Sequence, residues 1–332
     1  MKIVADNKIP YLNDVFEATG HEMLYLPASE ITSEVVRDAK VLLTRTRTRC
    51  DRALLEGSDV EFIGTATIGT DHIDLDYCRD HGITVANAPG CNAPAVAQWV
   101  HCAIIEWLKA NHITGPITLG IVGVGHVGSI VARWARQLGY RVLLNDPPLA
   151  ERSNTLTSPF SPLTSLQREC DIITFHTPLT SDGDYPTWHL CDEDFLNSLE
   201  RCRLIINAAR GAVCDNHALL YWDGDIALDC WENEPNINFE LLDKAFVATQ
   251  HIAGYSKQGK LRGTAMIISA LNSHYGWHLP VSQADRPVAG ASYVTPELIA
   301  NSYDIIAETI VLKSKPHFFE TLRNIYPLRS EI

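Results

Sequence analysis

The chain has 332 residues, of which 46% are hydrophobic and 20% are charged, as is typical of a soluble protein with two globular domains. Its net charge of −13 argues against nucleic acid or an anionic membrane as its main partner. The nine cysteines are scattered and contain no C-x-x-C pair, which predicts reduced thiols and no metal site. No apolar run has the length of a membrane span or of a signal region, so we expect a cytoplasmic protein.

Short apolar runs alternate with helix-like segments over residues 1–92. This alternation predicts a parallel sheet covered by helices. A helix predicted at Thr264–Tyr275 could pack back on this lobe, which would then be completed by residues from about 256 to 278. The predicted strands are Lys2–Ala5, Met23–Leu26, Val41–Thr44, Glu61–Ala66 and Thr84–Ala86.

The segment from Asn92 to about Asn111 has an apolar stripe at helical spacing, which predicts a long helix. The pattern fits a helix that joins two lobes and an ordinary domain helix equally well.

A glycine-rich turn follows a predicted buried strand at Ile117–Val122. Gly123-Val124-Gly125-His126-Val127-Gly128 has the form G-x-G-x-x-G, and Ser129–Leu138 has the pattern of a helix. Such a strand, turn and helix allow a pyrophosphate to approach the backbone at the positive end of the helix.

An acidic residue, Asp146, lies 18 residues after Gly128, directly after a predicted strand at Arg141–Asn145. A carboxylate at this point would bind the ribose hydroxyls of NAD and repel a 2′-phosphate. Glycine turns are common, but the turn, its flanking elements and the acid together indicate a dinucleotide site.

Further strands and helices alternate as far as residue 255, which predicts a doubly wound nucleotide-binding domain over residues 93–255. Residues 279–332 form a short remainder with helices predicted at Pro296–Glu308 and Pro316–Ile325. Because this remainder is too small to bury a core of its own, we expect it to pack on another domain or subunit. The predicted strands of the second domain, after the first two, are Asp171–Phe175, Leu204–Asn207, Ile226–Asp229 and Phe246–Thr249.

Three candidate catalytic residues each follow a predicted strand: Arg210, Glu234 and His251. In doubly wound folds ligands bind beyond the carboxyl ends of the strands, so these residues could meet at one cleft. Oxidation of a 2-hydroxy acid requires a base, for which histidine is suited near neutral pH, and a carboxylate to orient it. An arginine offers a planar fork for the substrate carboxylate. Each residue alone has a structural explanation, and the combination indicates catalysis.

The motifs of this chain resemble those of the D-2-hydroxyacid dehydrogenases over residues 1 to about 275. Within that family they are most similar to the branch that oxidises 4-phospho-D-erythronate. The resemblance rests on Gly64–His72, Ala88–Ala93, Ile121–Gly128, Asn145–Pro148, Thr174–Leu179, Arg210–Val213 and His251–Tyr255.

This resemblance implies a flavodoxin-like substrate lobe, a Rossmann NAD-binding lobe and a small C-terminal dimerisation region in a homodimer. It implies that Arg210 and Glu234 are active-site residues and that His251 transfers the proton. Contacts to substrate would come from Thr46, Thr67 and Tyr255. Contacts to NAD would come from Gly123, Gly125, His126, Val127, Gly128, Asp146, Thr177, Ala208, Ala209, Arg210, Asp229 and Gly254.

Two basic clusters could bind the phosphate of such a substrate. The first is Arg45-Thr46-Arg47-Thr48-Arg49, whose arginines would share one face if the segment were a strand. An exposed charged edge explains that cluster equally well. The second cluster is Lys257, Lys260 and Arg262.

Two alternative functions remain open. One is the same chemistry on another acid, such as 3-phosphoglycerate or an unphosphorylated 2-hydroxy acid. The other is a non-catalytic NAD-sensing protein on the same scaffold.

Overall fold

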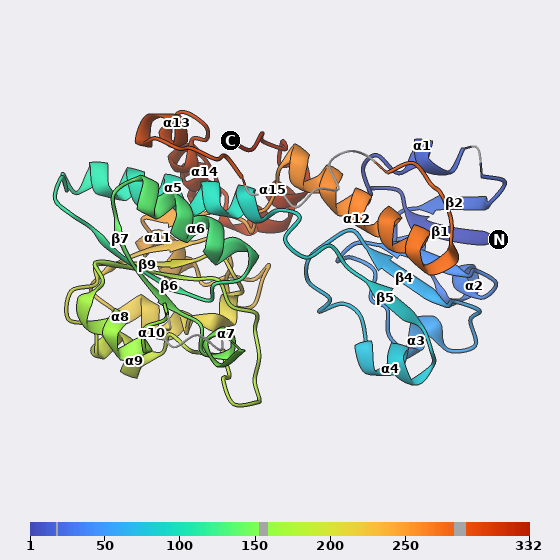
Figure 1. The fold of residues 1–332 in the computed structure, drawn as a ribbon, viewed down its shortest axis with the longest axis horizontal. Coiled ribbons are helices and arrows are strands. Elements are labelled where there is room, and N and C mark those ends of the chain that lie inside the picture. Colours follow the sequence, from blue (N-terminus) through green and yellow to red (C-terminus); the bar gives the residue numbers. More distant parts are fainter. Residues whose placement is uncertain (18, 153–158, 282–289) are drawn as a thin grey trace. The chain divides into compact units, whose positions relative to one another are not determined.

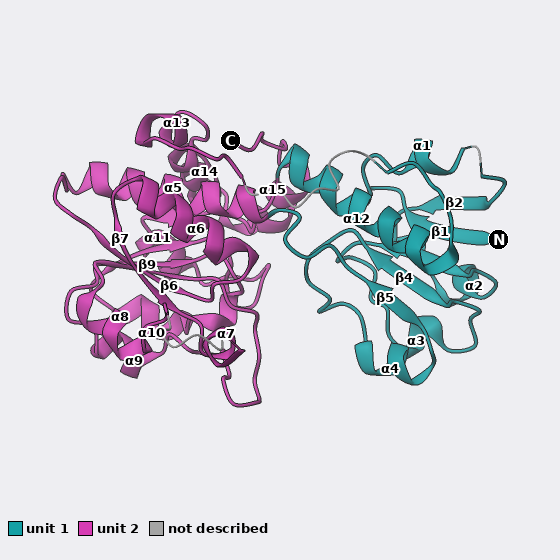
Figure 2. Cartoon of the chain, in the orientation of Figure 1, with its two compact units in different colours: residues 1–92, 256–288 teal, residues 93–255, 289–332 magenta. Residues whose placement is uncertain are grey.

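The computed structural model describes residues 1–17, 19–152, 159–281 and 290–332 (Figure 1). The chain divides into two compact units, coloured separately in Figure 2. The first unit comprises residues 1–92 and 256–288, and the second comprises residues 93–255 and 289–332.

The first unit is built on a parallel five-stranded sheet in the order β2-β1-β3-β4-β5, the flavodoxin-like order. Every predicted strand of this lobe is present, with ends that differ by at most one residue. The strands are β1 (Lys2–Asp6), β2 (Glu22–Leu26), β3 (Val41–Thr44), β4 (Phe62–Thr65) and β5 (Thr84–Ala86). The helices between them are short: α1 (Asn13–Phe16), η1 (Ala28–Glu30), α2 (Ser33–Val36), α3 (Arg52–Leu55) and α4 (Leu75–Asp80).

A long helix from late in the chain, α12 (Lys257–Tyr275), packs on this sheet. Its residues Ile267 and Leu271 are buried in the same core cluster as Ile3 and Leu43. Gly64 in β4 permits the close approach, because a Cβ there would lie 2.6 Å from Cγ2 of Ile267. The helix begins seven residues before the predicted start, since the Ser256 hydroxyl caps it by accepting a hydrogen bond from the Gly259 N–H at 2.9 Å.

The second unit is built on a parallel six-stranded sheet in the order β11-β10-β9-β8-β6-β7. A single parallel bridge from Phe160 to Leu144 of β7 extends the sheet on the β7 side, where a Rossmann sheet has its third strand. The predicted class of two parallel α/β sheets is therefore confirmed. The strands are β6 (Thr118–Val122), β7 (Arg141–Asn145), β8 (Ile172–Phe175), β9 (Leu204–Asn207), β10 (Asp225–Leu228) and β11 (Val247–Ala248).

The long helix α5 (Ala93–Ala110) belongs to the second unit. Trp99 and Trp107 are fully buried in one core cluster with residues of α6 (His126–Gln137). Of the two interpretations of this segment, the structure therefore supports a core helix of the nucleotide-binding unit. The other helices of this sheet are α7 (Pro147–Arg152), α8 (Leu163–Glu169), α9 (Glu193–Asn197), η2 (Gly211–Val213), α10 (Asn216–Tyr221) and α11 (Phe239–Lys244).

Residues 290–332 are part of the second unit, and residues 282–289 of the predicted C-terminal region lie outside the described residues. The prediction of one helix over Pro296–Glu308 is wrong, because the chain forms two helices there, separated by residues 301–304. The Asp304 carboxylate caps the second helix by accepting a hydrogen bond from the Ala307 N–H at 2.9 Å. The tail contains α13 (Pro296–Ala300), α14 (Ile305–Ser314), η4 (Pro316–Phe318) and α15 (Phe319–Ile325). None of the helices in the described ranges is both long and apolar enough to cross a membrane.

The packing of α12 predicts that Leu271→Ala destabilises the protein by about 2–5 kcal/mol, the usual effect of truncating a buried leucine. Leu271 is 0% exposed, whereas Ser273 on the same helix is exposed and makes Ser273→Ala a matched control. Denaturant unfolding measures both variants. A loss below about 1 kcal/mol for Leu271→Ala would contradict a core position for this helix.

Candidate active site

The three candidate catalytic residues follow neighbouring strands of the second sheet. Arg210 comes after β9, Glu234 after β10 and His251 after β11, and these strands are adjacent and parallel. Their carboxyl ends therefore lie at the same edge of the sheet, where ligands bind in open α/β folds.

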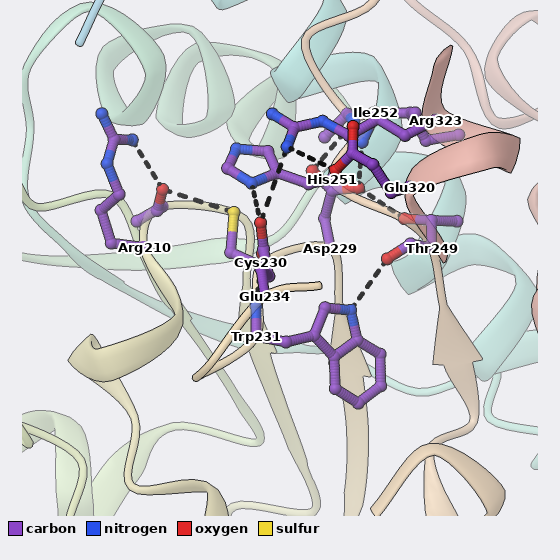
Figure 3. Close-up of polar contacts among 12 residues, drawn as sticks. Arg210, Asp229, Cys230, Trp231, Glu234, Thr249, His251, Ile252, Glu320 and Arg323 are labelled. Carbon is purple, nitrogen blue, oxygen red and sulfur yellow. Dashed lines mark hydrogen bonds and ion pairs between the residues drawn. The ribbon is translucent and has the colours of Figure 1, made fainter. Parts of the chain in front are cut away.

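Glu234 and His251 form a direct pair. Nδ1 of His251 lies 2.8 Å from Oε2 of Glu234, and the other carboxylate oxygen accepts a hydrogen bond from the Trp231 N–H at 2.8 Å (Figure 3). Because an ionised carboxylate only accepts hydrogen bonds, this contact assigns the imidazole proton to Nδ1. Nε2 then has the lone pair required of a general base.

The Glu234 carboxyl is held in its ionised form. Burial raises its pKa, but the charge and hydrogen bond of His251, the N–H of Trp231 and the charge of Arg323 outweigh burial and lower the pKa below its usual value. The Glu234 carboxylate is thus a charged acceptor for the ring N–H of His251. Any stability that this ionisation contributes is present above the ordinary glutamate pKa and is lost as the pH falls through the lowered value.

Asp229 anchors the backbone that carries His251. One carboxylate oxygen accepts hydrogen bonds from the Thr249 hydroxyl at 2.6 Å and the Ile252 N–H at 2.7 Å, and the other accepts from the Ala253 N–H at 2.9 Å. His251 itself has φ +57°, a conformation that costs a non-glycine residue energy unless its surroundings impose it. The Asp229 contacts are part of what imposes it.

Arg329, near the C-terminus, binds carbonyl groups of the loop that follows His251. Its guanidinium donates to the Ile252 carbonyl at 2.9 Å, to the Ala95 carbonyl of α5 at 2.9 Å and to the Ala253 carbonyl. A carboxylate therefore holds the N–H groups of Ile252 and Ala253 while a guanidinium holds their carbonyls. We call Asp229, Arg329 and the two residues that they bind, Ile252 and Ala253, the loop clamp.

The segment that carries Arg210 lies against Cys230 and Trp231, which precede Glu234 in the chain, through two close backbone contacts. The Cys230 thiol, whose pKa burial raises so that it remains a donor, donates to the Ala209 carbonyl at 3.4 Å. Gly211 lies directly against the Trp231 backbone, and a Cβ there would be 2.0 Å from its carbonyl atoms. Figure 3 shows Arg210, Cys230 and His251 as neighbours in this part of the unit, with the guanidinium donating to the Ala209 carbonyl at 2.9 Å.

The three glycines of the turn have different surroundings. Gly123 has φ +86° and Gly128 approaches it so closely that a Cβ on Gly128 would lie 2.0 Å from the Gly123 carbonyl oxygen. A Cβ on Gly125 would meet none of the described atoms within 4 Å. Gly125 is also the N-cap of α6 and has no side-chain cap, so N–H groups of His126 and Val127 are available to a ligand. This is a surface that a pyrophosphate fits.

Two further residues fit a dinucleotide. The Asp146 carboxylate accepts hydrogen bonds from the Val124 N–H at 2.8 Å and the Leu149 N–H at 3.0 Å, which ties the glycine turn to the end of β7. It retains lone pairs for ribose hydroxyls. The Thr177 hydroxyl, after β8 and beside Gly123, is buried and has no hydrogen-bond partner among the described residues, as expected of a group that a ligand completes.

The remaining predicted contacts of this unit lie near the same sheet edge. Ala208 and Ala209 follow β9, and the Ala209 N–H donates to the Asn207 side chain at 3.0 Å. Gly254 and Tyr255 follow the loop clamp and are half-buried. Each of these residues belongs to a segment whose backbone the structure fixes by hydrogen bonds.

Thr46 and Thr67 belong to the first unit. Thr67 follows β4, where its hydroxyl lies 2.7 Å from that of Thr65. Thr46 is exposed in a turn, because β3 ends at Thr44 and the Thr48 N–H bonds back to the Arg45 carbonyl at 3.4 Å.

The strand alternation considered for the Arg45–Arg49 cluster is therefore wrong. Arg45 forms an ion pair with the buried carboxylate of Asp6 at 3.0 Å, while Arg47 is exposed at the tip of the turn. In the second cluster, Arg262 is 5% exposed and donates to the Cys91 carbonyl at 2.7 Å, so its role is structural.

Within the described part of the chain, two groups of side chains have the composition of a metal site: Asp229, Cys230 and His251, and separately His189, Asp215 and Glu232. In both groups the carboxylates already accept protein donors. Glu232, for example, lies 2.7 Å from Nε2 of His189 and accepts the Asn216 N–H at 2.9 Å. These bonds explain both groups without an ion.

Sequence reasoning did not identify Arg323 and Arg329. Nε of Arg323 donates to the Tyr255 hydroxyl at 3.2 Å, and its Nη1 lies 3.9 Å from Oε2 of Glu234. The sequence holds no motif around these two arginines, and only the packing of the tail shows what they contact.

Known proteins share these features. Residues 99–253 match the family described as the D-isomer specific 2-hydroxyacid dehydrogenase, NAD binding domain. The erythronate-4-phosphate dehydrogenase of Bacteroides thetaiotaomicron is 45% identical over 100% of this chain and 97% of its own length. The protein of the same name from Porphyromonas gingivalis is 40% identical over 98% of this chain and 92% of its own.

A solved structure supports the fold. The NAD+-bound 3-phosphoglycerate dehydrogenase of Entamoeba histolytica superposes with a TM-score of 0.68 at 24% identity, covering 83% of this chain and 95% of its own. The glycine turn, the orphaned Thr177 hydroxyl and Asp146 agree with the cofactor that the family description names. The chain belongs to the NAD-dependent D-2-hydroxyacid dehydrogenases, and the two relatives above, which match 98–100% of it, are named erythronate-4-phosphate dehydrogenases.

Proposed function

We propose that the protein oxidises 4-phospho-D-erythronate to (R)-3-hydroxy-2-oxo-4-phosphooxybutanoate, a step of pyridoxal 5′-phosphate biosynthesis. Similarity to erythronate-4-phosphate dehydrogenases over the full chain supports the substrate. The contact between His251 and Glu234 at 2.8 Å is the observation that carries the chemistry. We further propose that the protein is a cytoplasmic homodimer.

The residues of the second unit would divide the work as follows. Nε2 of His251 accepts the proton of the C2 hydroxyl, and Glu234 stabilises the imidazolium that forms. Arg210 binds the substrate carboxylate through its planar guanidinium. Bound NAD supplies the ring carbon that accepts the C2 hydride. Tyr255, Thr46 and Thr67 are proposed to contact the rest of the substrate.

The glycine turn, Asp146 and Thr177 would hold the cofactor. The N–H groups at the start of α6 would bind the pyrophosphate, and Asp146 would bind the adenosine ribose. Thr177, Ala208, Ala209, Asp229 and Gly254 are proposed to line the nicotinamide end of the site.

The proposed base predicts that His251→Ala lowers kcat by about 10²–10⁴-fold, the usual contribution of general base catalysis, while NADH still binds.

NADH formation would be followed at fixed NAD with 4-phospho-D-erythronate, 3-phosphoglycerate and an unphosphorylated 2-hydroxy acid. The highest kcat/KM is expected for 4-phospho-D-erythronate. A higher kcat/KM for another acid would make that acid the assigned substrate. A wild-type protein that binds NADH but oxidises none of the three acids would be an NAD sensor and not an enzyme.

The surroundings of Gly125 and Gly128 predict that alanine weakens cofactor binding at one position and lowers the stability of the fold at the other. Gly125→Ala should fold normally but bind NAD more weakly, because its Cβ would enter the space assigned to the pyrophosphate. Gly128→Ala should lower the thermal stability, because its Cβ would overlap the Gly123 carbonyl. Calorimetric titration with NADH and thermal unfolding distinguish them. Unchanged NADH affinity in Gly125→Ala would exclude this turn as the cofactor site.

The exposed turn after β3 predicts the phosphate contact. Arg47 lies beyond the carboxyl end of a strand, beside Thr46, and we expect Arg47→Gln to raise KM about 10–100-fold for the phosphorylated acid, as the loss of a charged hydrogen bond does. The KM for an unphosphorylated acid should change much less. Arg37→Gln, at another exposed position of the same unit, is the control. Equal effects on both acids would remove this assignment.

A further inference from the structure

The C-terminal tail brings a cationic side chain to the Glu234–His251 pair. Arg323 of α15 donates from Nε to the Tyr255 hydroxyl at 3.2 Å, and its Nη1 lies 3.9 Å from Oε2 of Glu234. That is the oxygen that contacts Nδ1 of His251. Figure 3 shows the Arg323 guanidinium between His251 and Glu320, on the side of the pair away from Arg210.

The ion pair of Arg323 with Glu234 is less exposed to water than an ordinary surface ion pair. Its side chain is 17% exposed and that of Glu234 is 19% exposed, whereas Arg201, which pairs with Asp171 at 3.0 Å, is 60% exposed. Exposed pairs contribute little because water screens them, while charges withdrawn from water interact more strongly.

The packing of the tail fixes the position of this guanidinium. Before Arg323 in the chain, Phe319 is 1% exposed and lies in a core cluster with Leu312 of α14. After it, Arg329 is bound to the carbonyls of the catalytic loop. Because α15 is held at both ends, Arg323 is presented to Glu234 and Tyr255 by the fold and not by a mobile tail.

The charged and titratable groups around Glu234 come from several elements. His251 follows β11, Cys230 and Asp229 follow β10, and Arg323 and Glu320 project from α15, with Glu320 4.0 Å from Arg323. Burial raises the pKa of Glu234, while His251 most strongly and Arg323 to a smaller extent lower it. Arg323 thus favours the ionised carboxylate that orients the imidazole.

We propose that Arg323 is a positioning residue of the active site, which holds the Glu234 carboxylate and the Tyr255 hydroxyl in the places that the reaction requires. It acts through these two groups and not on the reacting atoms. The C-terminal segment from Phe319 to Arg329 is in this sense part of the catalytic apparatus. This inference rests on the proposed function of the Glu234–His251 pair.

The test compares Arg323→Gln and Arg323→Lys with Arg201→Gln as the matched control. Arg323→Gln is expected to lower kcat about 10–100-fold, because it removes both the charged hydrogen-bond donor to the Tyr255 hydroxyl and the ion pair with Glu234. Arg323→Lys should recover part of the loss because it retains the charge. The acidic limb of the pH–rate profile should move to higher pH in Arg323→Gln, and Arg201→Gln should match the wild type.

A second measurement does not depend on turnover. With ¹³C-labelled glutamate carboxyl groups, the NMR signal of Glu234, assigned by its absence in Glu234→Gln, should titrate at higher pH in Arg323→Gln than in the wild type. An unmoved titration overturns the proposal. So does a loss of activity that only follows the folded fraction in thermal unfolding. If no 2-hydroxy acid is oxidised by the wild type but the titration moves, the proposed reaction and the catalytic positioning role both fail, and only the electrostatic interaction of Arg323 with Glu234 stands.

Discussion

The loop clamp is the interaction on which the candidate site depends. Asp229 binds the N–H groups of Ile252 and Ala253, and Arg329 binds their carbonyls, so that the backbone of two consecutive residues is fixed by both its donors and its acceptors. His251 comes immediately before them with a left-handed backbone that few histidines adopt. A free chain would relax from this conformation, and the clamp prevents it. The direction of the imidazole toward Glu234 therefore follows from contacts made by its neighbours.

A buried hydrogen-bond network holds Asp229 of the loop clamp in place. Thr249 donates to Asp229 at 2.6 Å, and the indole of Trp231 donates to the Thr249 carbonyl at 2.8 Å (Figure 3). The Thr249 hydroxyl also accepts a hydrogen bond from the indole of Trp99 at 3.0 Å. These groups are almost fully buried, and each polar atom in the network has a partner. A satisfied buried network has one low-energy arrangement, which makes it a rigid base for catalytic side chains. The tryptophan of α5 explains why the long core helix matters to the site.

The C-terminal tail has a role in the site that its length does not suggest. It is too short to form a core alone, and it packs instead on the nucleotide-binding unit. In doing so it carries Arg329 to the backbone of the catalytic loop and Arg323 to the Glu234 carboxylate. Residues about 70 to 90 positions apart in the chain thereby share one cluster of charges, and a change in the tail can alter the chemistry without touching substrate.

The sequence by itself determined the two parallel sheets, the glycine turn and the positions of Arg210, Glu234 and His251 after successive strands. These features depend on local information: apolar periodicity defines the strands, and only glycine fits a turn as close as that between Gly123 and Gly128. The sequence also suggested that a late helix returns to the first unit, although the start of α12 depended on the Ser256 cap.

Only the tertiary structure decided which charges meet. The Arg45–Arg49 pattern resembles a strand, but the chain turns there and buried Asp6 engages Arg45, while Arg262 is occupied by a backbone carbonyl. Arg323 and Arg329 resemble any other basic residues of a polar tail until the tail is packed. An ion pair or a clamp between distant residues leaves no local periodicity, because its energy depends on distance in space and on withdrawal from water, and both arise only when the chain is folded.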